Sequence, residues 1–237
     1  MMTDRSTAPV TVLMRMDDTA GRPIEIERDV LRRAYIALQG LGRQIFAQCR
    51  PAERVAAESL SMSFVEPGPG EVVFELEIAQ DRPRRSPEHR PDRTRGAIVP
   101  VSSQNRALQL TAQTLVEIVR TVSFLLAARQ TAREVHEDHI DLIDADTGRR
   151  TRVSPHVDRG LRQDLFTHEV REFLSGLTRD GVGAVSLAIG GRLQRSQIQH
   201  PVIATDRSLA FASGTPLPLP LDAPADPDAR ASPPGAA

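Results

Sequence analysis

Hydrophobic and polar residues alternate with a period of two in several short stretches of the chain, which is the pattern of β-strands with one buried face. Turn-forming residues separate these stretches in pairs, so the sequence predicts β-hairpins. The predicted strand pairs are 10–16 with 23–27, 60–64 with 72–78, 140–142 with 150–153, and 185–189 with 193–198.

Apolar residues recur every three or four positions in three longer stretches, which is the spacing of one helix face. The predicted helices cover 28–49, 103–133 and 156–177, the last as one bent helix or two in tandem. The middle helix is the most hydrophobic, and we expect it to be the most deeply buried. Glu117 and Arg120 interrupt it, so it is not predicted to span a membrane. Gly40 and Gly42 are expected to let the first helix approach the middle one closely.

Hairpins that alternate with three or four helices predict an α+β fold, in which the helices pack on antiparallel sheet. Residues 80–96 hold six arginines, three prolines and no aliphatic side chain, so they are predicted to form a flexible, disordered linker. Seven prolines in 213–237 predict a disordered tail, partly in polyproline II conformation. The expected organisation is a disordered start at 1–8, a first ββαββ half at 9–79, the linker, and a second α-ββ-α-ββ half at 97–212 packed into the same core, followed by the tail.

Composition excludes several classes of chemistry. The 237 residues carry 30 basic and 31 acidic side chains, a net charge of −1 that argues against a general polycation for nucleic acid or membranes. Every basic residue is arginine, which indicates a GC-rich, bacterial genome and excludes a Schiff-base or phosphate-loop lysine. The single cysteine excludes an internal disulfide framework. The first residues do not form a secretory signal, so a cytoplasmic location is expected.

His136, His139 and Asp141 are the densest set of potential metal ligands in the sequence. Two histidines three residues apart can share one face of a helix, and the carboxylate could complete the site. The prediction places them where the 103–133 helix ends and a strand begins, so the imidazoles need not converge. A solvated helix end followed by an acidic turn is the simpler interpretation.

The linker is the second candidate site, because six arginines within 17 residues form a local cationic region that could contact phosphates. It has no aromatic residues on which bases could stack, so a solvated loop is the simpler interpretation. The candidate phosphate contacts are Arg82, Arg84, Arg85, Arg90, Arg93 and Arg95.

These observations favour a non-catalytic binding or assembly component of a bacterial multi-protein system, with no catalytic residue and no cofactor. The expected partners are other proteins, and self-association stays open. One alternative is a metal-dependent hydrolase that uses His136, His139 and Asp141. The other alternative is a nucleic-acid-binding accessory protein that acts through the arginines of 82–95.

Overall fold

The computed structural model describes residues 9–49, 58–80, 101–177, 182–190, 202–203 and 210–220. It confirms the predicted α+β class, with antiparallel strands in two sheets and helices between them. The strands are β1 (Val10–Asp17), β2 (Glu58–Gly68), β3 (Glu71–Gln80), β4 (Thr131–Val135), β5 (Ile140–Asp144), β6 (Arg150–Val153), β7 (Ala184–Ile189) and β8 (Val202–Ile203). The helices are α1 (Arg28–Cys49), α2 (Val101–Ala127), α3 (Pro155–Arg162) and α4 (Thr167–Leu177).

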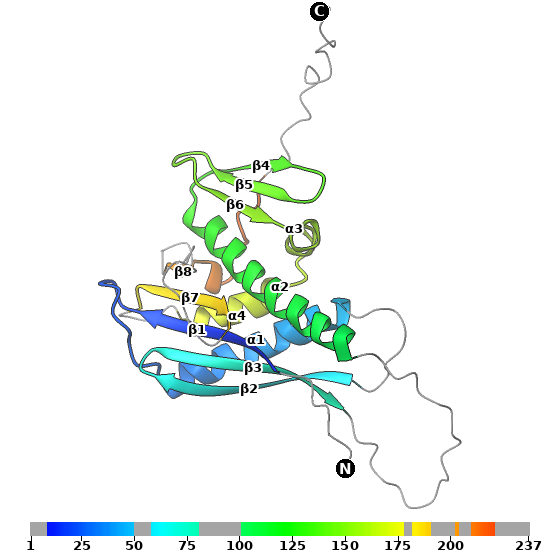
Figure 1. Cartoon of the computed structure of the whole chain (residues 1–237). Helices are drawn as coiled ribbons and strands as arrows, with labels where there is room; N and C mark the ends of the chain where they lie inside the picture. Colours follow the sequence, from blue (N-terminus) through cyan, green and yellow to red (C-terminus); the bar gives the residue numbers. More distant parts are fainter. Residues whose placement is uncertain are drawn as a thin grey trace, which may run out of the picture.

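The larger sheet has the strand order β2-β3-β1-β7-β8, and every pair in it is antiparallel. The smaller sheet has the order β4-β5-β6 and lies beside the C-terminal end of α2 (Figure 1). The long helix α2 therefore joins the two sheets: it packs with α1 on the large sheet, and it also contacts β6 and α3. The smaller sheet and its β4–β5 turn carry the candidate metal ligands.

The hydrophobic core lies between the large sheet and helices α1, α2 and α4. One continuous cluster of buried apolar side chains includes residues that precede and residues that follow the segment 81–100. The largest contribution of a single element is that of α2, whose buried apolar positions form two adjoining faces. The cluster members in α2 are Ala107, Leu108, Ala112, Leu115, Ile118, Val119, Val122, Phe124, Leu125 and Leu126.

The first predicted hairpin is wrong. Residues 23–27 do not form a strand, and a single bridge between Asp17 and Pro23 is all that pairs there. The reason is that a strand has two edges, and both edges of β1 are occupied by partners distant in sequence. Leu13 pairs with Val73 of β3 on one side and with Ala188 of β7 on the other.

The predicted 103–133 helix is also too long at its end. Helix α2 stops at Ala127, and Thr131–Val135 forms β4, which pairs in register with β5. The alanines and arginines around residue 128 are compatible with a helix, so the residue pattern alone predicted that the helix continues to residue 133. Tertiary contact decides the outcome, because Arg133 of β4 donates a 2.8 Å hydrogen bond to the carboxylate of Asp158 in α3.

Other predicted elements are confirmed. Helix α1 covers 28–49 as expected, the strands 60–64 and 72–78 belong to the β2–β3 hairpin, and 140–142 and 150–153 belong to β5 and β6. The 156–177 stretch is two helices in tandem. Between them Asp164 adopts a φ of 55°, a left-handed conformation that ends α3.

The glycines of α1 do allow close approach, but not only to α2. A Cβ at Gly42 would lie 2.9 Å from Leu60 of β2 and 3.9 Å from Leu115 of α2. A Cβ at Gly40 would lie 3.4 Å from Glu169 of α4. The closest approach at Gly42 is therefore to the sheet, and Gly40 faces α4.

The expected start of a disordered tail at Ser213 is too early, because residues 210–220 contact the folded chain. The buried Phe211 lies under the guanidinium of Arg171, 5.0 Å from its ring centre, and its carbonyl accepts a 2.9 Å hydrogen bond from Arg171 Nε. The carbonyl of Pro220 accepts a 3.2 Å hydrogen bond from Arg162. Gln80, the first residue of the predicted linker, is the last residue of β3. Segments 1–8, 81–96 and 221–237, and the strand predicted at 193–198, lie outside the described residues.

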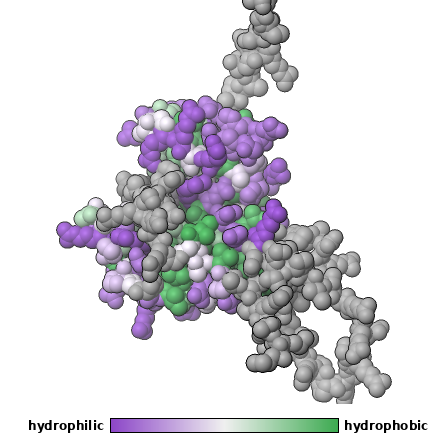
Figure 2. Space-filling view, viewed as in Figure 1, coloured by the Kyte–Doolittle hydropathy of each residue, from purple (hydrophilic) through white to green (hydrophobic). Residues whose placement is uncertain are grey.

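One helix segment, Arg106–Ala127, is long and apolar enough to cross a membrane by length and composition alone. In this structure 67% of its most apolar window is buried inside the protein, which is the pattern of a core helix. Hydrophilic residues predominate on the visible surface of the smaller sheet, whereas hydrophobic residues are more frequent below it (Figure 2). The smaller sheet therefore has a mainly polar surface and lies beside the C-terminal end of the apolar helix α2.

Candidate functional site at the β4–β5 turn

The predicted metal ligands lie on a β-hairpin turn. Strands β4 and β5 pair antiparallel, and the turn between them closes with a 2.9 Å hydrogen bond from the backbone N–H of His136 to the carbonyl of His139. The expectation of a helix end is therefore wrong, because α2 ends at Ala127, nine residues before His136, and leaves room for β4. The turn brings the two imidazoles together without any helical spacing.

Both imidazoles face the carboxylate of Asp141. The Nε2 atom of His136 lies 3.6 Å from Oδ2 of Asp141, and the Nε2 atom of His139 lies 3.6 Å from Oδ1. The rings stack with their centres 4.5 Å apart and an angle of 19° between their planes. One ligand atom from each of the three residues lies within 4.8 Å of the other two. The structure thus brings together all three residues that the sequence nominated.

The other ring nitrogen of His139, Nδ1, forms a hydrogen bond with Asp138. This Nδ1 lies 2.5 Å from Oδ1 of Asp138, and this hydrogen bond, with the charge of His139, lowers the pKa of the Asp138 carboxyl. On the other side of the site, Arg152 of β6 pairs with Asp141 in register, and its Nε lies 3.8 Å from Asp141 Oδ1. Sequence spacing did not point to Asp138 or Arg152; the β5–β6 register, once known, places Arg152 beside Asp141.

The strands below the turn are well anchored in the protein. Ile140 and Leu142 of β5 and Val153 of β6 are buried members of the hydrophobic cluster. In contrast, the side chain of His136 is 44% exposed, while those of His139 and Asp141 are 17% and 16% exposed. The site is consequently open on the His136 side and closed on the side of the sheet.

Two charged residues of α2 form hydrogen bonds with the end of β6 and with Ser154, just before α3. Oε1 of Glu117 accepts hydrogen bonds from the backbone N–H and the hydroxyl of Ser154, at 2.5 and 2.7 Å. Arg120 donates a 2.9 Å hydrogen bond to the carbonyl of Arg152. The residues that interrupt the apolar pattern of α2 are therefore those that fix the end of β6 and the start of α3.

The far end of β5 carries a second acidic turn, with a different role. The Asp144 carboxylate accepts hydrogen bonds from the hydroxyl of Thr147 at 2.6 Å and from the backbone N–H of Asp146 at 3.2 Å. The Thr147 hydrogen bond is the main cause of the lowered pKa of Asp144. Its oxygens are engaged in closing the β5–β6 turn.

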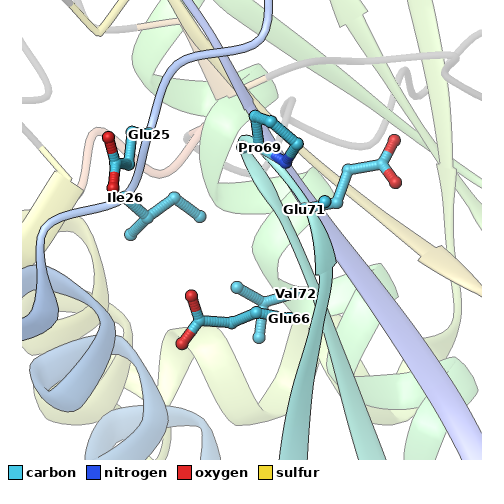
Figure 3. Close-up of a pocket in the computed structure, with 8 residues that line it drawn as sticks. Glu25, Ile26, Glu66, Pro69, Glu71 and Val72 are labelled. Carbon is cyan, nitrogen blue, oxygen red and sulfur yellow. The ribbon is translucent and has the colours of Figure 1, made fainter.

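An acidic pocket lies apart from this site, between the β2–β3 turn and the segment that follows β1 (Figure 3). It has a volume of about 340 Å³ and is lined by Glu25, Glu66 and Glu71, with Ile26 and Val72 below. In Figure 3 the side chain of Glu71 points away from the other two carboxylates. The three acids therefore do not converge as ligands of one ion.

The six arginines nominated as phosphate contacts, Arg82, Arg84, Arg85, Arg90, Arg93 and Arg95, lie outside the described residues. Comparison of the chain with protein-family models, with curated proteins and with solved structures gave no match.

Proposed function

We propose that the protein is a non-catalytic binding or assembly component that contacts a partner protein through the β4–β5 turn. The observation that carries the proposal is the contrast between an exposed turn and the anchored strand β5 that follows it, whose Ile140 and Leu142 are buried in the hydrophobic cluster. A loop that is already ordered loses little conformational entropy when it binds. Exposed turns on a rigid scaffold are also common positions for binding residues.

The chemistry of the turn indicates what kind of surface it fits. Val135 is 62% exposed, the largest exposed fraction among the large hydrophobic side chains of the described residues. It is followed by exposed Glu137 and Asp138. A complementary partner surface offers an apolar contact for Val135 and basic side chains for the two acids. The arginine-only basic composition supports a bacterial setting for this partner.

The test is site-specific cross-linking in cells that express the protein at its native level. A photoreactive amino acid in place of Glu137 should give a discrete covalent adduct with another protein. The matched control carries the same amino acid in place of Asp146, in the turn at the opposite end of β5, and should not give that adduct. Equal adducts from both positions, or none from position 137, would refute the proposed contact.

The hydrolase alternative is favoured by one observation: His136, His139 and Asp141 leave coordination positions free, as catalytic zinc sites do. Substrate sites are usually concave, however, and the 340 Å³ pocket is lined by none of these three residues. Turnover of ester or phosphoester substrates by the zinc-loaded protein, lost in His139→Ala, would support the hydrolase instead.

The nucleic-acid alternative needs the arginines of 82–95. If it holds, deletion of 82–95 abolishes binding to DNA or RNA, and the affinity of the intact protein falls steeply with salt, because binding releases counterions. Equal binding by the deletion variant would exclude this role for the segment.

A further inference from the structure

We propose that His136, His139 and Asp141 bind one divalent late transition-metal ion, with Zn²⁺ as the reference metal. The inference deepens the proposed function, since it names a ligand of the same turn. It needs no partner protein, so it can fail or hold independently of the cross-linking result.

The spacing of the ligand atoms carries the inference. Zinc–nitrogen and zinc–oxygen bonds of about 2.0–2.1 Å in a tetrahedron place neighbouring ligand atoms roughly 3.3–3.4 Å apart. The two Nε2–carboxylate distances are both 3.6 Å, which is within a few tenths of an ångström of that spacing. The three ligand atoms lie within 4.8 Å of one another, so bringing all of them to that spacing requires rotations of the His136, His139 and Asp141 side chains.

Ordinary hydrogen bonding does not explain the same geometry. Nitrogen–oxygen hydrogen bonds in proteins are about 2.7–3.2 Å long, so the two 3.6 Å separations lie beyond that range. Both imidazoles nevertheless direct Nε2 at the same carboxylate, and their rings are stacked in nearly parallel planes. A cation held between the three groups fits this convergence.

The hydrogen bond to Asp138 prepares His139 for this role. An ionised carboxylate can only accept a hydrogen bond, so the Nδ1 atom of His139 carries the proton in that contact. In the neutral imidazole this leaves the Nε2 lone pair free to bind a metal on the side of Asp141. A carboxylate that orients a histidine ligand in this way is the usual outer-shell partner in zinc sites. Asp138 is therefore a positioning residue.

The local charges are compatible with an added cation. Arg152 is the cationic side chain nearest to Asp141, at 3.8 Å, and its side chain is 69% exposed. It can turn towards solvent when a metal takes its place beside the carboxylate. Asp138 and Asp141 then offset the two charges of the ion.

The donor set selects a class of metal. Imidazole nitrogen suits zinc, copper, nickel and cobalt, whereas magnesium and calcium prefer six or more oxygen ligands. Two imidazoles and one carboxylate therefore favour the late transition metals. A fourth position remains for water or for a donor atom of a bound partner.

The experiment uses the full-length protein, freed of metal by a chelator and then titrated with Zn²⁺ and with Co²⁺. We expect one equivalent of either ion, with Co²⁺ giving the absorption bands of a nitrogen- and oxygen-ligated site. His139→Ala should weaken Zn²⁺ binding at least about tenfold, since a lost ligand matters no less than a lost outer-shell partner. His168→Ala, which removes an exposed histidine of α4, is the matched control and should bind as the wild type does.

Asp138 supplies a second, independent measurement. Asp138→Ala should weaken Zn²⁺ binding about 10–100-fold, and Asp138→Asn, which keeps an acceptor oxygen, should restore part of that loss. The substitutions at His136, Asp138 and His139 lie on the β4–β5 turn, and unchanged circular dichroism will show that the fold is retained. The inference is overturned if the wild-type protein binds less than one equivalent of Zn²⁺. It is equally overturned if the His136→Ala/His139→Ala double variant binds Zn²⁺ with wild-type affinity.

Discussion

Alanine in place of glycine should have opposite effects at two helical positions of this protein. At Gly160 of α3, an added Cβ would lie 2.2 Å from Cε2 of Phe166 and 3.0 Å from two further ring atoms. Carbon atoms in contact normally lie about 3.5–4.0 Å apart, so the ring would have to retreat by roughly 1.3 Å or more. Phe166 is only 1% exposed, so the retreat has to displace packed core atoms.

The expected change in the free energy of unfolding for Gly160→Ala is the balance of two contributions of opposite sign. Overpacking of this kind costs about 1–3 kcal/mol, while alanine in a helix gains at most about 1 kcal/mol over glycine. Because a buried ring has to move by more than an ångström, the overpacking cost falls in the upper part of its range, about 2–3 kcal/mol, and Gly160→Ala should lower the free energy of unfolding by about 1–2 kcal/mol. At Gly40 the nearest atom is Cγ of Glu169, at 3.4 Å, which is an ordinary van der Waals contact. Gly40→Ala should be neutral or stabilising by up to about 1 kcal/mol.

The assay is urea unfolding followed by circular dichroism, with equal m-values taken as the sign that both variants unfold from the same compact state. Because the two variants have the same chemical change, the difference between them isolates the contact with Phe166. A Gly160→Ala protein as stable as the wild type would refute the packing argument for α3. A Gly40→Ala protein destabilised as much as Gly160→Ala would refute the comparison.

Three further predictions concern α2 and the small sheet. Val122→Asp buries an unpaired carboxyl in the core and should abolish cooperative unfolding; a soluble, cooperatively folding monomer with this substitution would contradict the packing of α2. Glu117→Ala removes the acceptor of both Ser154 hydrogen bonds and should lower the unfolding free energy by about 1–3 kcal/mol, measured by urea titration. Thr147→Val should raise the pKa of Asp144 towards its ordinary value, as followed by carboxyl NMR. Because a lowered pKa stabilises the folded state above the unfolded pKa of about 3.9, the stability difference between Thr147→Val and wild type should shrink as the pH falls through the folded pKa.

The local pattern of apolar and polar residues correctly predicted helix α1 and the β2–β3 hairpin, whose contacts join residues close in sequence. The spacing of apolar residues predicted the extent of α1, and Pro51 just beyond it predicted where that helix ends. The alternating residues on either side of Pro67–Gly70 predicted the β2–β3 hairpin. What local patterns could not supply was the pairing of distant strands. Residues 23–27 have the composition of a strand, but β1 has no free edge for them, because β3 and β7 occupy both.

At the candidate site, too, the sequence predicted the residues correctly but not the structure in which they lie. The ligand types and their proximity in sequence nominated His136, His139 and Asp141, and the structure brings them together. Their setting was predicted incorrectly, since the end of α2 depends on contacts of β4 with β5 and α3. The contact between Asp138 and His139 depends on the conformation of the turn, which residue spacing alone does not define.

The central place of β1 in the large sheet has a consequence for how the protein folds during its synthesis. β1 is the first described strand to leave the ribosome, yet one of its two neighbours, β7, is among the last. Throughout most of translation, the edge of β1 that later pairs with β7 has no strand of its own chain to bind. An unpaired edge is a template for wrong strand pairing, and pairing between distant segments is slow. This topology therefore delays completion of the large sheet until β7 has been synthesised.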